Sequence, residues 1–287
     1  MNDRIRKEGM DCTDVARIAD LLICPYCAIP LKFCPESLIC SKCDRRYPVC
    51  DGVPLLARSG TLDTWGASAE SDTNSNVYQQ RYSDVDEASA YNAAYKRRLF
   101  KRMSTAREYR LLERLLKSQG HSQLILDIPC GGGRLSPRIA LFTDLLVEAD
   151  IAEGQVLYGR GHCSLSTPQI WMTASAFHIP FCDEGVDGTV CCRLCHHLPT
   201  EEERERLIKE LLRVSRRFVI MTFFDHYSLK NTLRRIRRPL DHKPPKMTMT
   251  IDRVRELARN HGARLIQCPA LAVLSSGHRY ALMVKDA

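Results

Sequence analysis

The 287-residue sequence has no long apolar run, and its N-terminus lacks the apolar core of a secretory signal. Its apolar runs, such as Leu145–Val147, are far too short to span a bilayer. The opening residues MNDRIRKEGMDC are charged, so we expect no secretory signal and a cytoplasmic location. Internal repeats and low-complexity tracts are also absent. With 44% hydrophobic and 26% charged residues, the composition is that of a globular protein.

A large excess of one charge is absent as well. The formal net charge of +8 is mild for this length, but its distribution is uneven. Between Leu229 and Lys246 there are seven basic residues and a single acid, Asp241. This concentration of positive charge favours an anionic partner or substrate over general surface charging.

Cysteine is abundant, with fourteen residues of two kinds. Most lie inside apolar runs, where a reduced thiol behaves as a small hydrophobic side chain. Four form the pattern C-x2-C-x12-C-x2-C, namely Cys24, Cys27, Cys40 and Cys43. Four thiolates on two short turns suit tetrahedral Zn²⁺, and because the protein fills all four positions the metal is expected to be structural. Without a secretory signal, a metal site is favoured over disulfides.

Composition and periodicity divide the chain into five segments. We expect a flexible arm or short helix over 1–20 and a zinc ribbon over 21–57. A linker rich in Ser, Thr, Gly and Asp is expected over 58–76, a helical lead-in that Gly120 stops over 77–120, and a larger domain over 121–287.

In the larger domain, apolar strands alternate with helical stretches. Strands are expected at 124–128, 145–149, 186–192, 217–224, 263–268 and 279–285. The clearest helix is PTEEERERLIKELLRVS, with Thr200 as N-cap, and another is expected at 251–261. Such alternation predicts a mostly parallel sheet covered by helices on both faces.

A glycine-rich turn follows the first of these strands in LILDIPCGGGRL. Glycine lets the backbone turn sharply and approach a ligand, and the next helix begins directly after the turn. Asp150 stands 23 residues after Asp127, at the end of the next strand, where it can accept hydrogen bonds from ribose hydroxyls. The spacing D-x-x-x-G-x-G differs from the G-x-G-x-x-G of dinucleotide-binding proteins.

The turn resembles the first motif of class I S-adenosylmethionine-dependent methyltransferases, written DxGCGxG after a strand. EADIAEGQVLYGR is similar to the second motif of that family, and ASAFHIPFCDEGVDGTVCCRLCHHLP to its adenine-bordering segment and fourth strand. The resemblance runs from about residue 120 to 285. It implies a Rossmann-like, seven-stranded, mostly parallel sheet with one reversed strand near an edge, and S-adenosylmethionine as cofactor.

The resemblance also implies which residues bind the cofactor. Asp127, Gly131 and Gly133 would surround its amino-acid part, Asp150 would hold the ribose, Ile151 would pack on adenine, and Ser175, Ala176 and Phe177 would lie at the adenine edge, with Cys192 after the fourth strand. Ser175 stands where the family usually has an acid, so the charge assistance of that hydrogen bond is lost.

The resemblance implies that residues after the fourth strand face the transferred methyl group, so the two histidines there are candidate catalytic residues. His196 or His197 could take a proton from a hydroxyl or amine acceptor, or one of them could begin the next helix. Methyl transfer can also proceed through proximity and orientation alone. The nearby Cys191, Cys192 and Cys195 allow a thiol nucleophile or an arsenic site, but buried packing is the commoner role of such residues.

Basic residues form the candidate substrate-binding set: Arg193, Arg234, Arg235, Arg237 and Arg238. They could bind phosphate, a sugar acid or a nucleic-acid backbone. The alternative is a solvated amphipathic helix with Leu233 and Ile236 facing inward.

The ribbon ends in YPVCDGVPLL, which resembles the YPVxDGIPxLL ending of a zinc-ribbon module that precedes many bacterial methyltransferases. A similar module exists as a free methyltransferase activator, so the ribbon either recognises substrate or packs on the catalytic domain. The acceptor class we favour is an anionic small molecule or a lipid- or sugar-linked metabolite. An RNA base is the second hypothesis, and a non-catalytic cofactor-binding or activator protein is the third.

Overall fold

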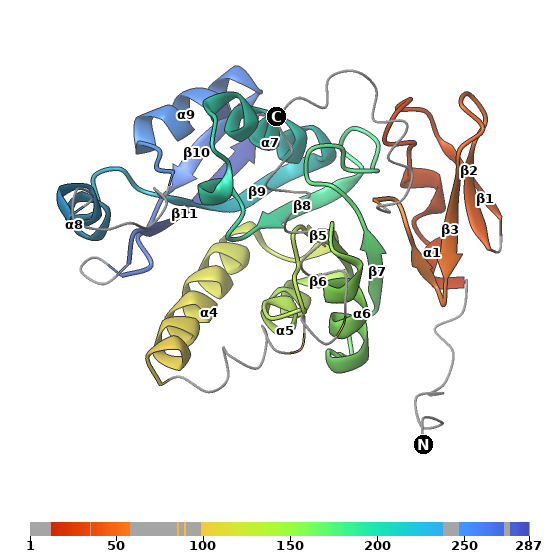
Figure 1. Cartoon of the computed structure of the whole chain (residues 1–287), viewed down its shortest axis with the longest axis horizontal. Coiled ribbons are helices and arrows are strands. Elements are labelled where there is room, and N and C mark those ends of the chain that lie inside the picture. Colours follow the sequence, from red (N-terminus) through yellow and green to blue (C-terminus); the bar gives the residue numbers. More distant parts are fainter. Residues whose placement is uncertain are drawn as a thin grey trace.

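The larger domain is built around a seven-stranded sheet with helices on both faces (Figure 1). The computed structural model describes residues 13–34, 36–57, 85, 89, 99–237, 247–272 and 276–286. The predicted linker over 58–76, most of the lead-in before Leu99, and Arg238 lie outside the described residues.

The strands of the main sheet are β5 (Ser122–Asp127), β6 (Thr143–Asp150), β7 (Gln169–Thr173), β8 (Val186–Cys191), β9 (Ser215–Phe224), β10 (Ala263–Gln267) and β11 (His278–Lys285). The helices around it are α4 (Leu99–Gln119), α5 (Ser136–Ile139), η2 (Ala140–Phe142), α6 (Glu153–His162), η3 (Cys195–His197), α7 (Glu201–Val214), α8 (Leu229–Arg237) and α9 (Ile251–Asn260).

The strand order is β10-β11-β9-β8-β5-β6-β7. The pairs between β9, β8, β5, β6 and β7 are parallel, and β11 runs antiparallel to both of its neighbours, β9 and β10. This arrangement confirms the predicted mostly parallel, seven-stranded sheet with one reversed strand near an edge. It also places the carboxyl ends of β5, β6, β8 and β9 at one edge of the sheet.

Alternate residues of the central strands supply two separate cores. Leu124 and Leu126 belong to the cluster that contains the buried residues of α7 and α9, whereas Ile125 and Leu146 belong to the cluster that contains those of α4 and α5. The helix α7 buries leucines and an isoleucine at helical spacing in the first of these clusters. Its predicted start is confirmed, because Thr200 and Glu203 form a reciprocal capping box.

Strand β7 is absent from the six strands that the sequence pattern indicates. All five of its residues, QIWMT, are buried, so its sequence shows no alternation of polar and apolar residues. Trp171 is 1% exposed and fills the space beside the glycine turn. The apolar stretch is short, and its parallel pairing with β6 identifies it as a strand.

The N-terminal region forms a small antiparallel sheet. The strands of this sheet are β1 (Leu31–Cys34), β2 (Ser37–Cys40), β3 (Arg46–Cys50) and β4 (Val53–Pro54), and two short helices, α1 (Thr13–Ala16) and η1 (Ala19–Leu21), precede them. Of the flexible arm or short helix expected over 1–20, the described part is helical, and Val15 and Ile18 are at most 1% exposed and belong to the main core. Their helical spacing is too short a signal to predict this packing.

This small sheet lies against the edge strand β7 (Figure 1). Leu55 forms a parallel bridge with Thr173, and Leu22 forms an antiparallel bridge with Phe181. Backbone amides of Ile23 and Leu56 donate to the carbonyl oxygens of Pro180 and Thr173, at 3.1 Å each. The edge of the main sheet is thereby covered instead of being left open for pairing with another chain.

No helix within the described part of the chain combines the length and the apolarity that crossing a bilayer requires.

Candidate functional site

The glycine-rich turn follows β5 and leads into α5. Gly131 has a φ of +56° and Gly133 a φ of +73°, a backbone conformation that favours glycine. A Cβ added to Gly131 would meet no atom within 4 Å, whereas one on Gly133 would lie 2.8 Å from the Trp171 ring. The two glycines therefore have different roles. Gly131 borders open space that can admit a ligand, and Gly133 lets the turn pack on β7.

Three carboxyl groups lie on one face at the ends of β5 and β6. Asp127 and Glu148 are paired across the two strands, and Asp150 lies two residues further along β6. Each is at most 1% exposed. Neither carboxylate oxygen of Asp127 has a hydrogen-bond partner among the described residues. A buried acceptor of this kind is costly unless a donor reaches it, so this position favours a ligand with a cationic or hydrogen-bonding group.

Asp150 connects the glycine turn to the start of α6. Its carboxylate oxygens accept hydrogen bonds from the backbone amides of Gly131 and Ala152, both at 2.9 Å. Each oxygen has a further lone pair, so the carboxylate can also accept from ligand hydroxyls. Ile151, next to it, is half-buried.

Burial changes the proton affinity of all three carboxyl groups. It raises the pKa of Asp127 well above its usual value, with Glu148 and Asp150 adding repulsion. Burial also raises the pKa of Glu148 to about 7 and that of Asp150 to about 6. The amides of Ala152 and Gly131 oppose the increase at Asp150.

The predicted adenine-edge residues lie directly after β7. Ser175, Ala176 and Phe177 are each at most 8% exposed. The Ser175 hydroxyl accepts a hydrogen bond from the Phe177 amide at 3.3 Å, so it closes the turn in this structure. The Arg206 guanidinium lies 5.5 Å from the Phe177 ring centroid.

A buried ion-pair network surrounds Glu108 of α4, which the sequence gives no reason to single out. Its carboxylate accepts hydrogen bonds from Arg134 (2.5 Å), Arg193 (2.9 Å) and the Tyr280 hydroxyl (2.5 Å). Burial alone would raise the pKa of Glu108, but the two guanidinium groups outweigh burial and lower it to about 2. The network joins α4 to the glycine turn, the end of β8 and β11. Arg193, predicted to bind substrate, is part of it.

The predicted catalytic histidines lie in η3, after β8. His196 is 7% exposed, and His197 is exposed. The His196 ring stacks on Phe224 with 4.2 Å between ring centroids, and it meets His278 edge-on at 5.1 Å. Burial and the charge of Arg193 lower the pKa of His278 to about 3, so its imidazole is neutral near pH 7. Cys192, beside this cluster, is buried among the α4-side core residues.

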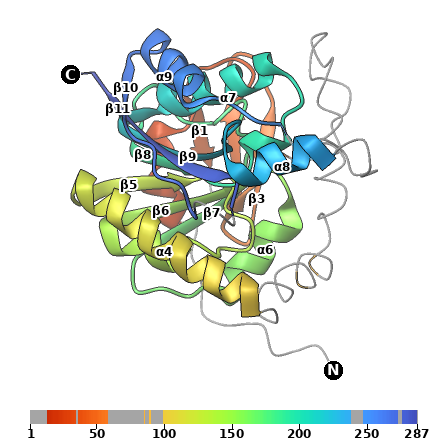
Figure 2. The same cartoon turned by 90° about the vertical axis from the view of Figure 1, so that its left-hand side faces the viewer.

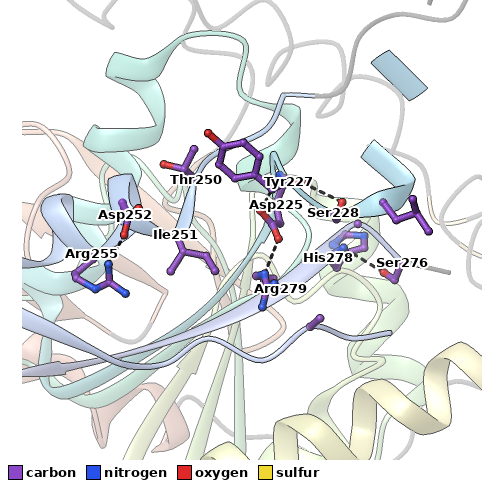
Figure 3. Close-up of a pocket in the computed structure, with 13 residues that line it drawn as sticks. Asp225, Tyr227, Ser228, Thr250, Ile251, Asp252, Arg255, Ser276, His278 and Arg279 are labelled. Carbon is purple, nitrogen blue, oxygen red and sulfur yellow. Dashed lines mark hydrogen bonds and ion pairs between the residues drawn. The ribbon is translucent and has the colours of Figure 1, made fainter. Parts of the chain in front are cut away.

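A cavity of about 390 Å³ opens beside the same aromatic cluster (Figure 3). His278 lines it together with residues that follow β9 and begin α9. Two ion pairs stand in its wall: Asp225 with Arg279, at 2.6 Å, and Asp252 with Arg255. The cavity therefore carries charges of both signs in balanced pairs, with the neutral His278 between it and His196.

The predicted basic residues of the later segment lie on α8. Arg234 donates to the Asn231 amide oxygen at 3.0 Å and lies over the Phe224 ring, and Arg235 donates to the His226 carbonyl oxygen at 2.5 Å. Arg237 is exposed. Leu233 and Ile236 are 41% and 69% exposed, so the alternative in which they face inward is wrong.

The four paired cysteines converge at the tips of the small sheet. Their sulfur atoms lie within 4.8 Å of one another, and those of Cys24 and Cys43 are 3.9 Å apart. A tetrahedron with Zn–S bonds of about 2.3 Å has edges of about 3.8 Å, so the cluster fits this geometry. The buried Tyr47 hydroxyl lies 3.2 Å from the Cys24 sulfur. Cys50 is exposed and lies outside the cluster.

Comparison with known proteins identifies both parts of the chain. A family described as "Methyltransferase domain" matches residues 125–217. The N-terminal region is homologous to the UPF0434 protein of Methylobacillus flagellatus. The two are 37% identical over 43 residues, which are 14% of this chain and 72% of the relative.

Solved structures share the fold of the larger domain. Magnesium protoporphyrin IX methyltransferase from Synechocystis PCC 6803 with bound SAH has a TM-score of 0.63 and 16% identity, over 74% of this chain and all of that chain. The same enzyme with bound SAM gives a TM-score of 0.56 and 15% identity, over 77% of this chain. At this identity the likeness concerns the fold alone.

The raised pKa values of the three carboxyl groups predict a loss of stability as pH rises. A group whose pKa is higher in the folded state stabilises the fold below its unfolded pKa and loses that contribution as pH rises through the folded value. His278, with its lowered pKa, acts in the opposite direction up to about pH 6.5. Because three carboxyl groups outweigh one imidazole, the free energy of unfolding without ligand should fall between about pH 4.5 and 7, by up to roughly 1.4 kcal/mol per pH unit for each carboxyl group in excess.

Urea denaturation at a series of pH values measures this slope. Asp127→Asn removes one of the titrating groups at nearly constant shape, so its decline should be shallower than that of the wild type. Asp144→Asn, an exposed position on the same strand β6, should keep the wild-type slope. Equal slopes for the wild type and Asp127→Asn would contradict the assignment.

Proposed function

Because the chain contains a class I S-adenosylmethionine-dependent methyltransferase domain and its N-terminal region belongs to the UPF0434 protein family, we propose that it methylates O or N of an anionic acceptor, either a small molecule or a lipid- or sugar-linked metabolite. One observation carries the cofactor part of the proposal. The buried carboxylate of Asp127 has no hydrogen-bond partner among the described residues, and it lies at the start of the turn whose Gly131 borders open space.

The residues at the ends of β5, β6 and β7 suit the parts of S-adenosylmethionine. Asp127 would accept from the cationic amino group, and Asp150 would accept from ribose hydroxyls while its backbone bonds hold the turn. Ile151 and Phe177 would pack on adenine. When bound, the cofactor supplies a methyl group activated by the sulfonium. Gly133 and Cys192, also predicted cofactor residues, support this site by packing.

The cavity beside His278 is our candidate acceptor site. His278 connects it to η3, where the family resemblance places the transferred methyl group, because its ring lines the cavity and meets that of His196. Because its pKa is low, His278 can accept a hydrogen bond from a hydroxyl or amine of the methyl acceptor, but it does not keep a proton near pH 7. His196 or His197 would take the proton, and the walls would fix the acceptor's orientation.

The cations of α8 favour an anionic acceptor and also support the second hypothesis, an RNA base. The helix contains Lys230, Arg234, Arg235 and Arg237 and no acid. Incubation with methyl-labelled cofactor separates the hypotheses. Label in the small-molecule or lipid fraction of an extract supports the first, and label in RNA supports the second.

Loss of the Asp150 carboxylate should weaken cofactor binding. By calorimetry, Asp150→Asn should bind S-adenosylmethionine at least about tenfold more weakly than the wild type, because a charged acceptor of ribose hydrogen bonds is removed. Asp144→Asn, on the same strand but exposed, should bind like the wild type. Thermal melting of both variants checks that they fold.

Two results would count against this assignment. Unchanged affinity in folded Asp150→Asn, or no wild-type binding at millimolar cofactor, would contradict the cofactor site. Tight binding without label transfer to any fraction would favour the non-catalytic hypothesis.

We also propose that the four-cysteine cluster holds a structural Zn²⁺. Sulfur–sulfur distances fit tetrahedral coordination, and four protein ligands leave no position for water. The residues around the cluster bond with the main sheet at β7 and at 180–182. The metal would therefore stabilise the segment that carries Ser175–Phe177.

Elemental analysis should find about one zinc per chain, as a four-thiolate site requires. Cys27→Ser should lose the metal and lower the melting temperature, whereas Cys50→Ser should retain both, because Cys50 lies outside the cluster. A wild-type protein that folds fully and contains no zinc after purification without chelators would contradict the proposal.

A further inference from the structure

Helix α8 presents its apolar side chains to solvent. Leu229, Leu233 and Ile236 are 48%, 41% and 69% exposed. Their spacing of four and three residues places them on one face of the helix. Tyr227, just before the helix, is 75% exposed, and we group it with these three residues as the exposed stripe. A surface helix normally turns such a stripe toward the core, so the orientation of α8 is reversed.

The face of α8 that contacts the domain is polar. Asn231 is 2% exposed, and its amide nitrogen donates to the carbonyl oxygens of Asp225 (2.8 Å) and Gly277 (3.4 Å). A Cβ on Gly277 would lie 2.4 Å from the Asn231 amide, so glycine is needed for this close approach. These bonds fix the roll of the helix. Rotating α8 to bury its leucines would leave the Asn231 amide and two carbonyl groups without these partners.

Cations flank the exposed stripe. Lys230, Arg234, Arg235 and Arg237 follow its members along the helix, and α8 contains no acid to balance them. The helix therefore combines an exposed apolar stripe with positively charged side chains around it. It lies at the opposite end of the molecule from the N-terminal sheet (Figure 1), and Figure 2 shows it from the side on which it projects.

This combination identifies one kind of partner. Nucleic acid would use the cations, but exposed leucine and isoleucine gain nothing from phosphates, and the only aromatic side chain in the stripe is Tyr227. An anionic bilayer surface uses both features, because its interface accepts the apolar strip and its head groups attract the cations. We propose that α8, with Tyr227, docks the protein on anionic lipid membranes.

Docking would place the candidate acceptor cavity at the lipid surface. Tyr227, Ser228 and Leu229 line that cavity, and Tyr227 and Leu229 also belong to the exposed stripe. The cavity thus lies beside the face that would contact lipid, and Figure 3 shows Tyr227 and Ser228 in its lining. A lipid-linked acceptor could enter it without leaving the membrane. Membrane docking itself does not depend on methyl transfer, and it can be measured without cofactor.

Co-sedimentation with vesicles tests the proposal on the full-length chain. The wild type should bind vesicles of phosphatidylcholine containing about a third phosphatidylglycerol, bind pure phosphatidylcholine weakly, and dissociate as salt increases. Absence of binding to the anionic vesicles at low salt would overturn the proposal.

Matched variants distinguish docking through α8 from nonspecific adsorption to vesicles. Leu233→Glu combined with Ile236→Glu should reduce vesicle affinity at least about tenfold, since it charges the strip that enters the interface. Leu141→Glu, at a position 62% exposed beside the amino end of β6, should leave it unchanged. A second pair of variants tests the contribution of positive charge. Arg237→Glu on α8 should weaken vesicle binding, whereas Lys117→Glu at the end of α4 should not. All these positions are exposed, so melting temperatures should match the wild type.

RNA binding provides the opposing result. Vesicle binding that the Leu233→Glu and Ile236→Glu pair leaves intact would contradict docking through α8. Salt-dependent retention on RNA that requires Arg237 but neither Leu233 nor Ile236, without vesicle binding, would replace the membrane with nucleic acid as the partner.

Discussion

The site depends on one electrostatic constraint, the burial of the Asp127 carboxyl group at the end of β5. Burial in a low-dielectric environment penalises the ionised form, and Glu148 and Asp150 on the same sheet face increase the penalty. A cationic ligand would relieve this penalty, so the binding of such a ligand would be coupled to the ionisation of the site. The glycine turn gives a ligand access to this carboxylate, because Gly131 has no side chain to fill the open space that it borders. The Glu108 network then holds the turn, β8 and β11 in fixed relation.

A second constraint is the exposed edge of the sheet. Strand β7 carries the predicted adenine-edge residues at its end, and an unpaired edge there would be free to fray or to pair with another chain. The N-terminal sheet covers it through the bridges of Leu55 with Thr173 and of Leu22 with Phe181. Val53 and Leu55 share a small core with Trp171, the residue against which Gly133 packs. The small sheet and the glycine turn therefore stabilise each other through β7.

Local patterns account for what the sequence predicts well. The strand-turn-helix around Gly131, the Thr200 cap and the convergence of the four cysteines follow from short motifs with strict backbone or ligand requirements, whereas the reversed strand follows from the family resemblance. Long-range contacts account for what it misses. Glu108 and Tyr280 are 172 residues apart, and nothing near either one indicates the other. The exposed stripe of α8 is missed because helical spacing indicates an amphipathic helix but not which face turns inward. Asn231 and Gly277, 46 residues apart, decide that.

A crystal structure with S-adenosylhomocysteine bound tests the central claim, that the carboxyl ends of β5 and β6 form the cofactor site. The account predicts the ligand's amino group against Asp127, its ribose hydroxyls on Asp150 and its adenine beside Ile151 and Phe177. A ligand bound elsewhere, or one whose ribose does not contact Asp150, would contradict it.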